Sequence, residues 1–373
     1  MSRISAVLSR LVVAFLGVKL ITLLGNLLWF PVLRSPPAPD RRERDDPAPG
    51  VTVLLPMRNE AARLPGTLPG LFAGGAAQLI FLDDESTDDS AGIVRRAAGA
   101  RPAGATPGVR VLSGAPRPDG WTGKTWACAQ LADHTDAELL VFCDVDVELG
   151  AGAITAVVDE MNRQRADVFS VFPRERTVSW AERLLVPQID DVVLCFLPFG
   201  LLRAPAPSAA TACGALLAFR RTAYDSVGGF AAVRTELVED VAVARLSRRH
   251  GLRLGLALGG DQLAVRMCDG YRGVIDNLGR GLTATAGGSR GLVIAGFAWH
   301  LLAYTLPLAL IGRSRWWRVA ALLAVMERLL VESKTGGGDW PAAMAVAASP
   351  VAALPVVARA MRRQQTWRGR VYG

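Results

Sequence analysis

Three acidic clusters stand in order along the middle of this 373-residue chain and hold its strongest candidates for chemistry. They occupy residues 82–86, 143–147 and 238–241, with the sequences Leu-Asp-Asp-Glu-Ser, Cys-Asp-Val-Asp-Val and Val-Glu-Asp-Val. The first two close short, very apolar runs, which are typical of buried strands. Because an open α/β sheet binds ligands beyond the carboxyl ends of its strands, these carboxylates are expected at one sheet edge.

Asp144 and Asp146 flank a single valine where a strand is expected to end. Side chains alternate along an extended chain, so both carboxylates can project to one side and share a divalent cation. Mg²⁺ or Mn²⁺ held in this way would bridge a diphosphate and neutralise its charge. The structural alternative is a pair of solvated loop carboxylates.

Asp83 and Asp84 also end an apolar run. Their carboxylates could accept hydrogen bonds from a nucleobase N–H or a ribose hydroxyl. The alternative is that Asp84, Ser86 and Asp88 only shape a turn and cap the following helix, for which Asp88 is well suited.

Glu239 and Asp240 are expected in the first turn of a helix, where the helix dipole favours carboxylates whether or not they have a function. A functional interpretation makes Asp240 a general base that takes a proton from an attacking hydroxyl group. An acceptor carboxyl group would already be ionised near neutral pH and would need a base less.

Strands and helices alternate in the first half of the chain, which predicts an α/β fold with a parallel sheet covered on both faces. The expected strands are 51–55, 78–83, 109–113 and 138–144, and the expected helices are 59–72, about 89–98, 124–134 and 151–163. The second half is less regular, with expected strands at 167–172 and 213–220, one apolar helix at 179–199, a helix from 239 to about 250 and an amphipathic element at 269–282.

The two ends of the chain are more apolar than an ordinary soluble enzyme. Hydrophobic residues make up 51% of the chain, charged residues 20%, and the mean hydropathy is +0.27. Segment 11–33 is long enough to cross a bilayer, and it shows no clear cleavage site for a signal peptide. Three more apolar segments lie at 291–311, 316–331 and 341–357.

Charged residues inside the apolar segments need partners. Lys19 and Asn26 would either face other helices or place their helix partly in the membrane interface. Asp190 and Asp191 would either meet the headgroup of an acceptor or pack between helices. The five cysteines are odd in number and lack Cys-x-x-Cys spacing, which favours reduced thiols in a cytosolic domain.

The net charge of +8 is concentrated beside the apolar segments, as expected for cytoplasmic flanks attracted to anionic lipid. No basic stripe with interleaved aromatics occurs in the middle of the chain, so no nucleic-acid partner is expected. The flanking arginines are Arg34, Arg41, Arg42, Arg44, Arg359, Arg362, Arg363, Arg368 and Arg370.

These flanks predict a multi-pass protein of the cell (plasma) membrane whose catalytic domain faces the cytoplasm. Four full crossings would place both termini on one side and the central domain on the other. The arginines favour both termini and the linker inside. One segment, 11–33 or 316–331, is therefore expected to be re-entrant or interfacial.

Four motifs in order make the chain resemble the family 2 inverting glycosyltransferases of GT-A fold. They are Pro-Met-Arg-Asn-Glu at 56–60, the acidic run 83–88, Asp-Val-Asp at 144–146 and Glu-Asp at 239–240. The resemblance covers roughly residues 50–282. The strings at 120–127, 265–267 and 366–372 narrow it to a membrane-bound branch that contains hopanoid-associated glycosyltransferases and the 4,4′-diaponeurosporenoate (carotenoid) glycosyltransferase.

The resemblance implies a role for each matching residue. Asp240 would be the catalytic base, and Asp144 and Asp146 would hold the metal. The chain lacks the Gln-x-x-Arg-Trp string that polymer-forming relatives carry after the base, which argues against a long-chain polymer product. The positions implied to bind the nucleotide sugar are Pro56, Arg58, Glu60, Asp83, Asp84, Lys124, Asp144 and Glu239.

The sequence therefore predicts an α/β GT-A domain (nucleotide-diphospho-sugar transferase, Rossmann-like) with N- and C-terminal transmembrane helices. It would move a hexose from a nucleotide diphosphate sugar, with UDP as the expected nucleotide, to a lipid acceptor such as a carotenoid or hopanoid. The alternatives are a polyprenyl-phosphate sugar transferase and a non-catalytic membrane scaffold. The predicted parts are a membrane anchor at 1–34, a linker at 35–50, the GT-A domain at 51–282, transmembrane segments at 283–358 and a basic tail at 359–373.

Overall fold

The computed structural model describes residues 3–35, 48–202, 204, 209–362, 365–367 and 370–372. Its contacts divide the chain into two compact units. The α/β unit comprises Pro31–Arg174 and Gly200–Val265, and the helical unit comprises Met1–Phe30, Glu175–Phe199 and Arg266–Gly373. The domain bounds expected from the sequence stay a prediction, since the helical unit is assembled from three separate stretches of chain.

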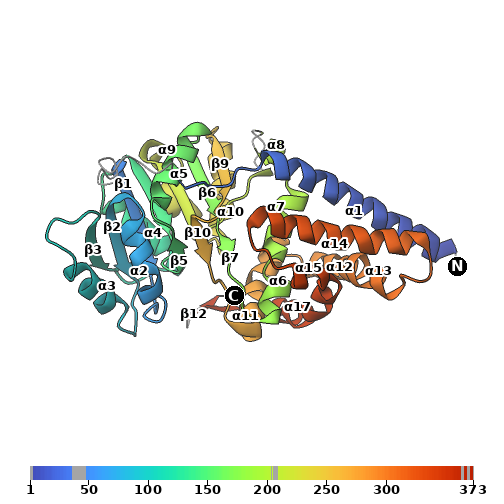
Figure 1. The fold of residues 1–373 in the computed structure, drawn as a ribbon. Coiled ribbons are helices and arrows are strands. Elements are labelled where there is room, and N and C mark those ends of the chain that lie inside the picture. Colours follow the sequence, from blue (N-terminus) through green and yellow to red (C-terminus); the bar gives the residue numbers. More distant parts are fainter. Residues whose placement is uncertain are drawn as a thin grey trace. The chain divides into compact units, whose positions relative to one another are not determined.

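A seven-stranded sheet forms the centre of the α/β unit, in the order β3-β2-β1-β4-β8-β6-β9 (Figure 1). The prediction of a parallel sheet is right for the pairs β1–β2, β2–β3, β1–β4 and β6–β9 and wrong for β8, which runs antiparallel to both neighbours. The strands are β1 Ala48–Met57, β2 Ala76–Asp83, β3 Gly108–Ser113, β4 Leu139–Cys143, β6 Val168–Phe172, β8 Leu216–Arg220 and β9 Leu254–Leu258.

The central strands are apolar on both sides, as buried strands must be. Every residue of β4, β6 and β9 is buried, and Val53, Leu54 and Leu55 of β1 are fully buried. A smaller sheet joins β5 Val147–Leu149, β10 Leu263–Val265 and β7 Arg174–Glu175. The helices of this unit are α2 Leu64–Ala73, α3 Ser90–Gly99, α4 Gly123–Asp133, α5 Ala153–Arg163, α9 Arg221–Ser226 and α10 Glu239–Arg249, with the 3₁₀ helix η2 at Gly229–Val233 and the short α8 Phe199–Leu202 at its border.

Register aligns the strand ends that the motifs follow. Met57 at the end of β1 pairs with Asp83 at the end of β2, and Leu54 pairs with Phe142 of β4. The loops after β1, β2 and β4 therefore begin at one edge of the sheet. The expected helix at 59–72 begins later, at Leu64, because Asn59 adopts a left-handed backbone with φ of 55°.

The helical unit holds the apolar segments. The expected single helix at 179–199 is wrong, because it breaks at Pro187, whose missing N–H cannot continue a helix. The two halves are α6 Trp180–Leu185 and α7 Gln188–Phe196. The other helices are α1 Arg3–Trp29, α11 Gly270–Thr285, α12 Arg290–His300, a π turn Leu301–Thr305, α13 Leu306–Ala309, α14 Arg315–Thr335, α15 Trp340–Met344, η4 Val346–Ala348, α16 Ser349–Ala352 and α17 Leu354–Ala360, with a hairpin of β11 Gln365–Trp367 and β12 Arg370–Tyr372.

Two helices are long and apolar enough to cross a membrane, judged by length and composition alone. They are Arg3–Trp29 and the continuous helical stretch Arg290–Ala309. The expected segment 316–331 lies in α14 but is not a third such helix among the described residues. A shorter apolar helical stretch covers Val346–Ala360.

Helix α1 turns its polar residues inward and its apolar residues outward. Ile4, Ile21 and Leu28 are 79%, 72% and 77% exposed, whereas Lys19 and Asn26 are almost fully buried. This is the reverse of a helix on the surface of a water-soluble domain. The outward face of α1 therefore suits a lipid environment.

Lys19 joins α1 to three other helical segments of the same unit. Its ammonium lies 2.7 Å from Asp191 Oδ2 of α7 and 3.0 Å from Glu327 Oε1 of α14, and it also donates to the Tyr304 hydroxyl. The hypothesis that Lys19 faces other helices is thus confirmed, and Asp191 packs between helices. Asp191, Cys195 and Glu327 are close enough to hold a metal ion, but the Lys19 ammonium already bridges two of the three.

Asn26 confirms the same hypothesis about two turns further along α1. Its amide nitrogen donates to the carbonyls of Leu194 and Leu197, at 2.8 and 2.9 Å. Its amide oxygen accepts from the Phe199 N–H at 2.9 Å. The open end of α7 is therefore capped by a side chain from α1.

Replacing Lys19 tests the role of this buried ion cluster. Lys19→Met leaves Asp191 and Glu327 buried without their counter-charge, so it should destabilise the helical unit by about 3–5 kcal/mol. Thermal unfolding in detergent would measure the loss. Adding Asp191→Asn and Glu327→Gln should restore most of it, while Arg290→Met on the exposed start of α12 should have no effect. Equal effects of Lys19→Met and Arg290→Met would contradict a buried pairing role.

Candidate active site

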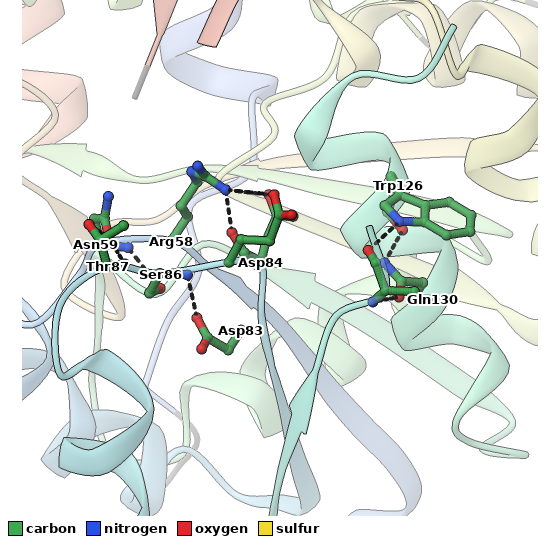
Figure 2. A network of polar contacts seen from close by, with 10 residues as sticks. Arg58, Asn59, Asp83, Asp84, Ser86, Thr87, Trp126 and Gln130 are labelled. Carbon is green, nitrogen blue, oxygen red and sulfur yellow. Dashed lines mark hydrogen bonds and ion pairs between the residues drawn. The ribbon is translucent and has the colours of Figure 1, made fainter. Parts of the chain in front are cut away.

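The loops that follow β1 and β2 are joined by Arg58 (Figure 2). Its guanidinium donates to the Asp84 carbonyl at 2.6 Å and to Glu85 Oε2 at 3.3 Å. The Asp84 carboxylate lies 3.9 Å away, and its side chain is largely buried. Arg58 and Asp84, which the sequence predicted at one site, are therefore neighbours in the structure.

Asn59 forms a second link between the same two loops. Its N–H donates to Ser86 Oγ at 3.0 Å, and its side-chain oxygen accepts from the Thr87 N–H at 2.7 Å. Both loops make left-handed turns, at Asn59 and at Glu85, whose φ is 57°. Asn59, Ser86 and Thr87 were not predicted as site residues, although the Asn-Glu and Glu-Ser-Thr strings mark their positions.

The remaining residues of this group shape the turn. Asp83 Oδ1 accepts from the Ser86 N–H at 3.1 Å, and Asp88 accepts from the backbone N–H groups of Ala61 and Ser90, at 3.0 and 3.1 Å. The turn-shaping alternative is thus confirmed for Asp88, and Asp83 takes the same kind of role. Glu60 is buried, and its carboxylate pairs with Arg63 at 3.1 Å. Pro56 lies in β1, opposite Leu82.

Lys124 occupies the first turn of α4, which Thr122 begins by accepting the Thr125 N–H. The Lys124 ammonium lies 2.9 Å from Asp144 Oδ1 and 3.2 Å from Glu239 Oε1. It also donates to the Gly214 carbonyl at 3.2 Å. One ammonium therefore joins the start of α4, the end of β4 and the start of α10.

The charge of Lys124 is firmly held. Burial alone would lower the pKa of this amine, but the carboxylates of Asp144 and Glu239 outweigh burial and raise it well above its usual value. Lys124 therefore remains an ammonium throughout the physiological range of pH.

Both carboxylate oxygens of Asp240 are held by backbone N–H groups. The Gly214 N–H donates to Oδ2 at 2.7 Å, and the Val241 N–H donates to Oδ1 at 2.7 Å. Burial and the neighbouring Glu239 carboxylate raise the pKa of Asp240 to about 6, against the opposing effect of Lys124. A carboxylate with such a pKa can accept a proton near neutral pH and is held in one orientation.

Gly214 is the point at which these groups converge. A side-chain carbon placed on it would lie 3.0 Å from Lys124 Nζ and 3.2 Å from Asp240 Oδ2. The preceding residue, Cys213, is held by the fully buried Ser170, whose hydroxyl accepts from the Cys213 N–H at 2.8 Å and donates to its carbonyl at 3.1 Å. Sequence reasoning missed Gly214 and Ser170. A glycine directly before a buried strand was the available signal.

Asp144 and Asp146 fit a divalent cation by the chemistry of their oxygens. They lie two residues apart in the turn between β4 and β5, where the Val147 N–H donates to the Asp144 carbonyl at 3.2 Å. Around Gly214, the carboxylates of Asp144, Glu239 and Asp240 outnumber the single ammonium. A divalent cation held there would neutralise part of this negative charge.

The predicted site residues thus fall into two groups at one sheet edge. One group follows β1 and β2, and the other surrounds Gly214 at the end of β4. Strand β1 pairs with both β2 and β4, so the two groups belong to the same unit and the same edge. This is the edge where α/β sheets bind nucleotides.

Comparison with known families identifies this unit. Residues 52–228 match the family model described as glycosyl transferase family 2. The chain carries a family 2 glycosyltransferase domain. The matched range includes β1, β2, β4, Lys124 and Gly214, and it ends before Glu239 and Asp240.

One curated relative is the 4,4′-diaponeurosporenoate glycosyltransferase of Staphylococcus haemolyticus (strain JCSC1435), which is 31% identical over 130 residues. The match covers 34% of this chain and spans about a third, 32%, of the length of that relative. The sequence resemblance to a membrane-bound branch of the family is consistent with this match.

A solved structure extends the fold comparison to nearly the whole chain. The mannosyltransferase PcManGT from Pyrobaculum calidifontis, in complex with GDP-Man and Mn²⁺, has a TM-score of 0.51 and 18% identity. The likeness covers 95% of this chain and 98% of that one. It supports the GT-A fold, with the mixed sheet that the register shows.

Gly214→Ala tests whether the groups around this glycine act together. The added methyl group would press on Lys124 and Asp240, so glycosyl transfer should fall at least about tenfold. The unfolding temperature should change little, because Gly214 has an ordinary backbone conformation and lies at the end of a loop. A radiometric transfer assay and calorimetry would measure the two effects.

The matched control for this substitution is Gly66→Ala. Gly66 lies in α2 of the same unit with open space around its Cα. Its replacement should leave transfer unchanged. If Gly214→Ala transferred sugar as fast as Gly66→Ala, the close approach of Lys124 and Asp240 to Gly214 would not matter for the rate of transfer.

Proposed function

We propose that this protein transfers a hexose from a nucleotide diphosphate sugar to a lipid acceptor at a membrane, with inversion at the anomeric carbon. The observation that carries the proposal is the group of Lys124, Asp144, Glu239 and Asp240 around Gly214. It combines a fixed cation, carboxylates that suit a divalent metal, and one carboxylate whose pKa of about 6 suits a general base.

The donor is proposed to lie along the sheet edge. Asp84 and Arg58 would contact the nucleoside, and Pro56, Glu60 and Asp83 would shape that pocket. Lys124 would pair with the diphosphate or with sugar oxygens. UDP is the expected nucleotide, and the GDP-Man and Mn²⁺ bound by PcManGT make GDP-mannose the first alternative donor to test.

Asp144 and Asp146 would hold Mg²⁺ or Mn²⁺. A bound metal would neutralise the diphosphate and so make it a better leaving group. The role of Glu239 follows from its position. It would hold Lys124 in place by pairing with it, and its negative charge would help to raise the pKa of Asp240.

Asp240 is proposed to accept the proton of the acceptor hydroxyl. As that proton moves to the carboxylate, the acceptor oxygen forms a bond to the anomeric carbon. The bond from that carbon to the diphosphate oxygen breaks, and the nucleoside diphosphate leaves with its electron pair. The backbone N–H groups of Gly214 and Val241 hold the base through this single displacement.

A lipid acceptor is supported by the helical unit and by the relative. The unit exposes apolar residues along α1 and buries Lys19, the charged residue in the middle of that helix, as expected for a surface in lipid. The name of the Staphylococcus haemolyticus relative indicates a carotenoid acid as its acceptor. A carotenoid, a hopanoid or a similar apolar molecule would reach the enzyme through the membrane.

Localisation at the plasma membrane is proposed with three crossings. Besides Arg3–Trp29 and Arg290–Ala309, α14 has 21 residues and a length of about 31 Å, and its charged Glu327, Arg328 and Glu332 face inward. Three crossings place the α/β unit and the C-terminal segment on the same side, which is proposed to be the cytoplasm because nucleotide sugars are made there. The predicted anchor at 1–34 would then have its N-terminus outside.

Asp240→Asn tests the proposed base. Transfer should fall by roughly a hundredfold or more, because general base catalysis contributes on that scale. The affinity for the nucleotide sugar, measured by calorimetry with Mn²⁺, should stay within about threefold, since Asp240 is proposed to serve the acceptor. Asp159→Asn on the exposed face of α5 is the matched control. Equal loss of donor binding and transfer would assign Asp240 a structural role.

The pH profile gives an independent reading of the same carboxylate. The base acts when deprotonated, and its pKa is raised to about 6, so the transfer rate should fall as pH drops through 6 and level off above 7. An ordinary aspartate would keep its activity down to about pH 4. The residual activity of Asp240→Asn should show no fall in rate near pH 6. A fall near pH 6 that persists in this variant would assign the titration to another group.

A further inference from the structure

The two long helices α1 and α14 run parallel, so their N-terminal ends lie together (Figure 1). Three contacts fix the register along their length. Trp317 Nε1 donates to Ser5 Oγ at 3.3 Å, Lys19 pairs with Glu327 at 3.0 Å, and Lys334 donates to the Leu27 carbonyl at 2.9 Å. The start of α1 and the turn before α14 therefore form one end of the helical unit.

This end carries a group of exposed arginines. The guanidinium groups of Arg10 and Arg315 both lie over the ring of Trp316, at 5.7 and 5.2 Å from its centre. Two cations thus share one aromatic ring, which attracts each of them but leaves their mutual repulsion in place. Five exposed arginines lie at this end, and we refer to them together as the arginine end. They are Arg3, Arg10, Arg313, Arg315 and Arg318.

No carboxylate compensates the arginine end. The sequence has no Asp or Glu in residues 1–39, 277–326 or 340–373. The nearest acid along α14 is Glu327, ten residues beyond Trp317 and so about 15 Å along the axis, and its carboxylate already pairs with Lys19. Within the ranges that the structure describes, none of the five arginines forms an ion pair.

Apolar side chains surround the arginines on the neighbouring turns. Ile4, Val7 and Leu11 of α1 are 79%, 56% and 53% exposed, and Ile311 after α13 and Leu322 of α14 are 43% and 65% exposed. Cations that project beyond an apolar belt, beside a tryptophan, are typical of the boundary between lipid chains and headgroups.

We propose that the arginine end binds the phosphate groups of anionic phospholipids at that boundary. The proposal rests on the membrane-embedded part of the proposed function, and it is independent of the glycosyl transfer. A guanidinium can donate two parallel hydrogen bonds to one phosphate, so each lipid supplies the anion that the chain lacks. The apolar belt distinguishes a lipid from an acidic soluble partner, which would leave that belt in water.

Lipid retention measures this interaction directly. The full-length protein would be reconstituted in nanodiscs of phosphatidylcholine and phosphatidylglycerol, and native mass spectrometry would count the lipids that it retains. A triple variant combines Arg10→Gln, Arg313→Gln and Arg315→Gln. Its retention of phosphatidylglycerol should fall about tenfold or more, because each arginine near an anionic surface strengthens lipid binding several-fold. Retention of phosphatidylcholine should not change.

A matched control removes the same charge from the α/β unit. Arg95, Arg245 and Arg249 are exposed and form no ion pair among the described residues. Their replacement by Gln should leave retention of phosphatidylglycerol unchanged. An equal loss in both variants, or no loss in either, would overturn the proposal.

Two further measurements do not depend on the triple variant. The first uses salt on the wild-type protein, and the second asks whether the protein is embedded in a membrane at all. In the wild type, bound phosphatidylglycerol should decrease as NaCl rises from 0.1 to 0.5 M, since salt shortens the range of the attraction from about 10 Å towards 3 Å. Retention that salt leaves unchanged would overturn the proposal. Flotation with vesicles of phosphatidylcholine alone tests embedding separately, and a failure to float would overturn membrane embedding without bearing on the catalytic site.

Discussion

The ammonium of Lys124 is the constraint on which the candidate active site depends. It holds together the start of α4, the turn after β4 and the start of α10, through Asp144, the Gly214 carbonyl and Glu239. Without this cation, three carboxylates would face one another around Gly214. With it, Asp144 and Glu239 have a fixed partner, while the backbone N–H groups of Gly214 and Val241 hold Asp240, whose pKa burial and Glu239 raise. The site is therefore organised before any donor binds, as efficient catalysis requires.

The helical unit uses the same arrangement for a different purpose. There the ammonium of Lys19 lies between Asp191 and Glu327, deep among apolar helices. In both units one lysine contacts three other chain segments that are distant in the sequence. At the sheet edge the cluster is partly exposed, with the Lys124 and Asp144 side chains 20% and 34% exposed, whereas in the helical unit it is buried and fastens α1 to α7 and α14. The two clusters therefore differ in exposure rather than in composition.

Local patterns predicted much of the fold. The apolar runs before Asp83 and Asp144 gave the correct strands, and the parallel register of β1 with β2 and β4 brought their ends together. Long-range pairing was not predictable in this way, because β8 inserts antiparallel between β4 and β6 without any local sign of direction. The convergence on Gly214 was also not predicted, since a glycine close to a buried strand marks a close approach of other groups but not which distant side chains make it. Pro187, which divides α6 from α7, was a visible signal that the apolar pattern obscured.

The central claim is that this family 2 glycosyltransferase adds a hexose to a membrane lipid. Comparative mass spectrometry of total lipids, from cells that express the wild type and cells that express Asp240→Asn at equal level, tests it most directly. The account predicts lipid species heavier by one hexose residue in the wild-type cells, which release that sugar on mild hydrolysis and are absent with the variant. Identical lipid profiles in the two strains, with wild-type protein folded in the membrane, would contradict it.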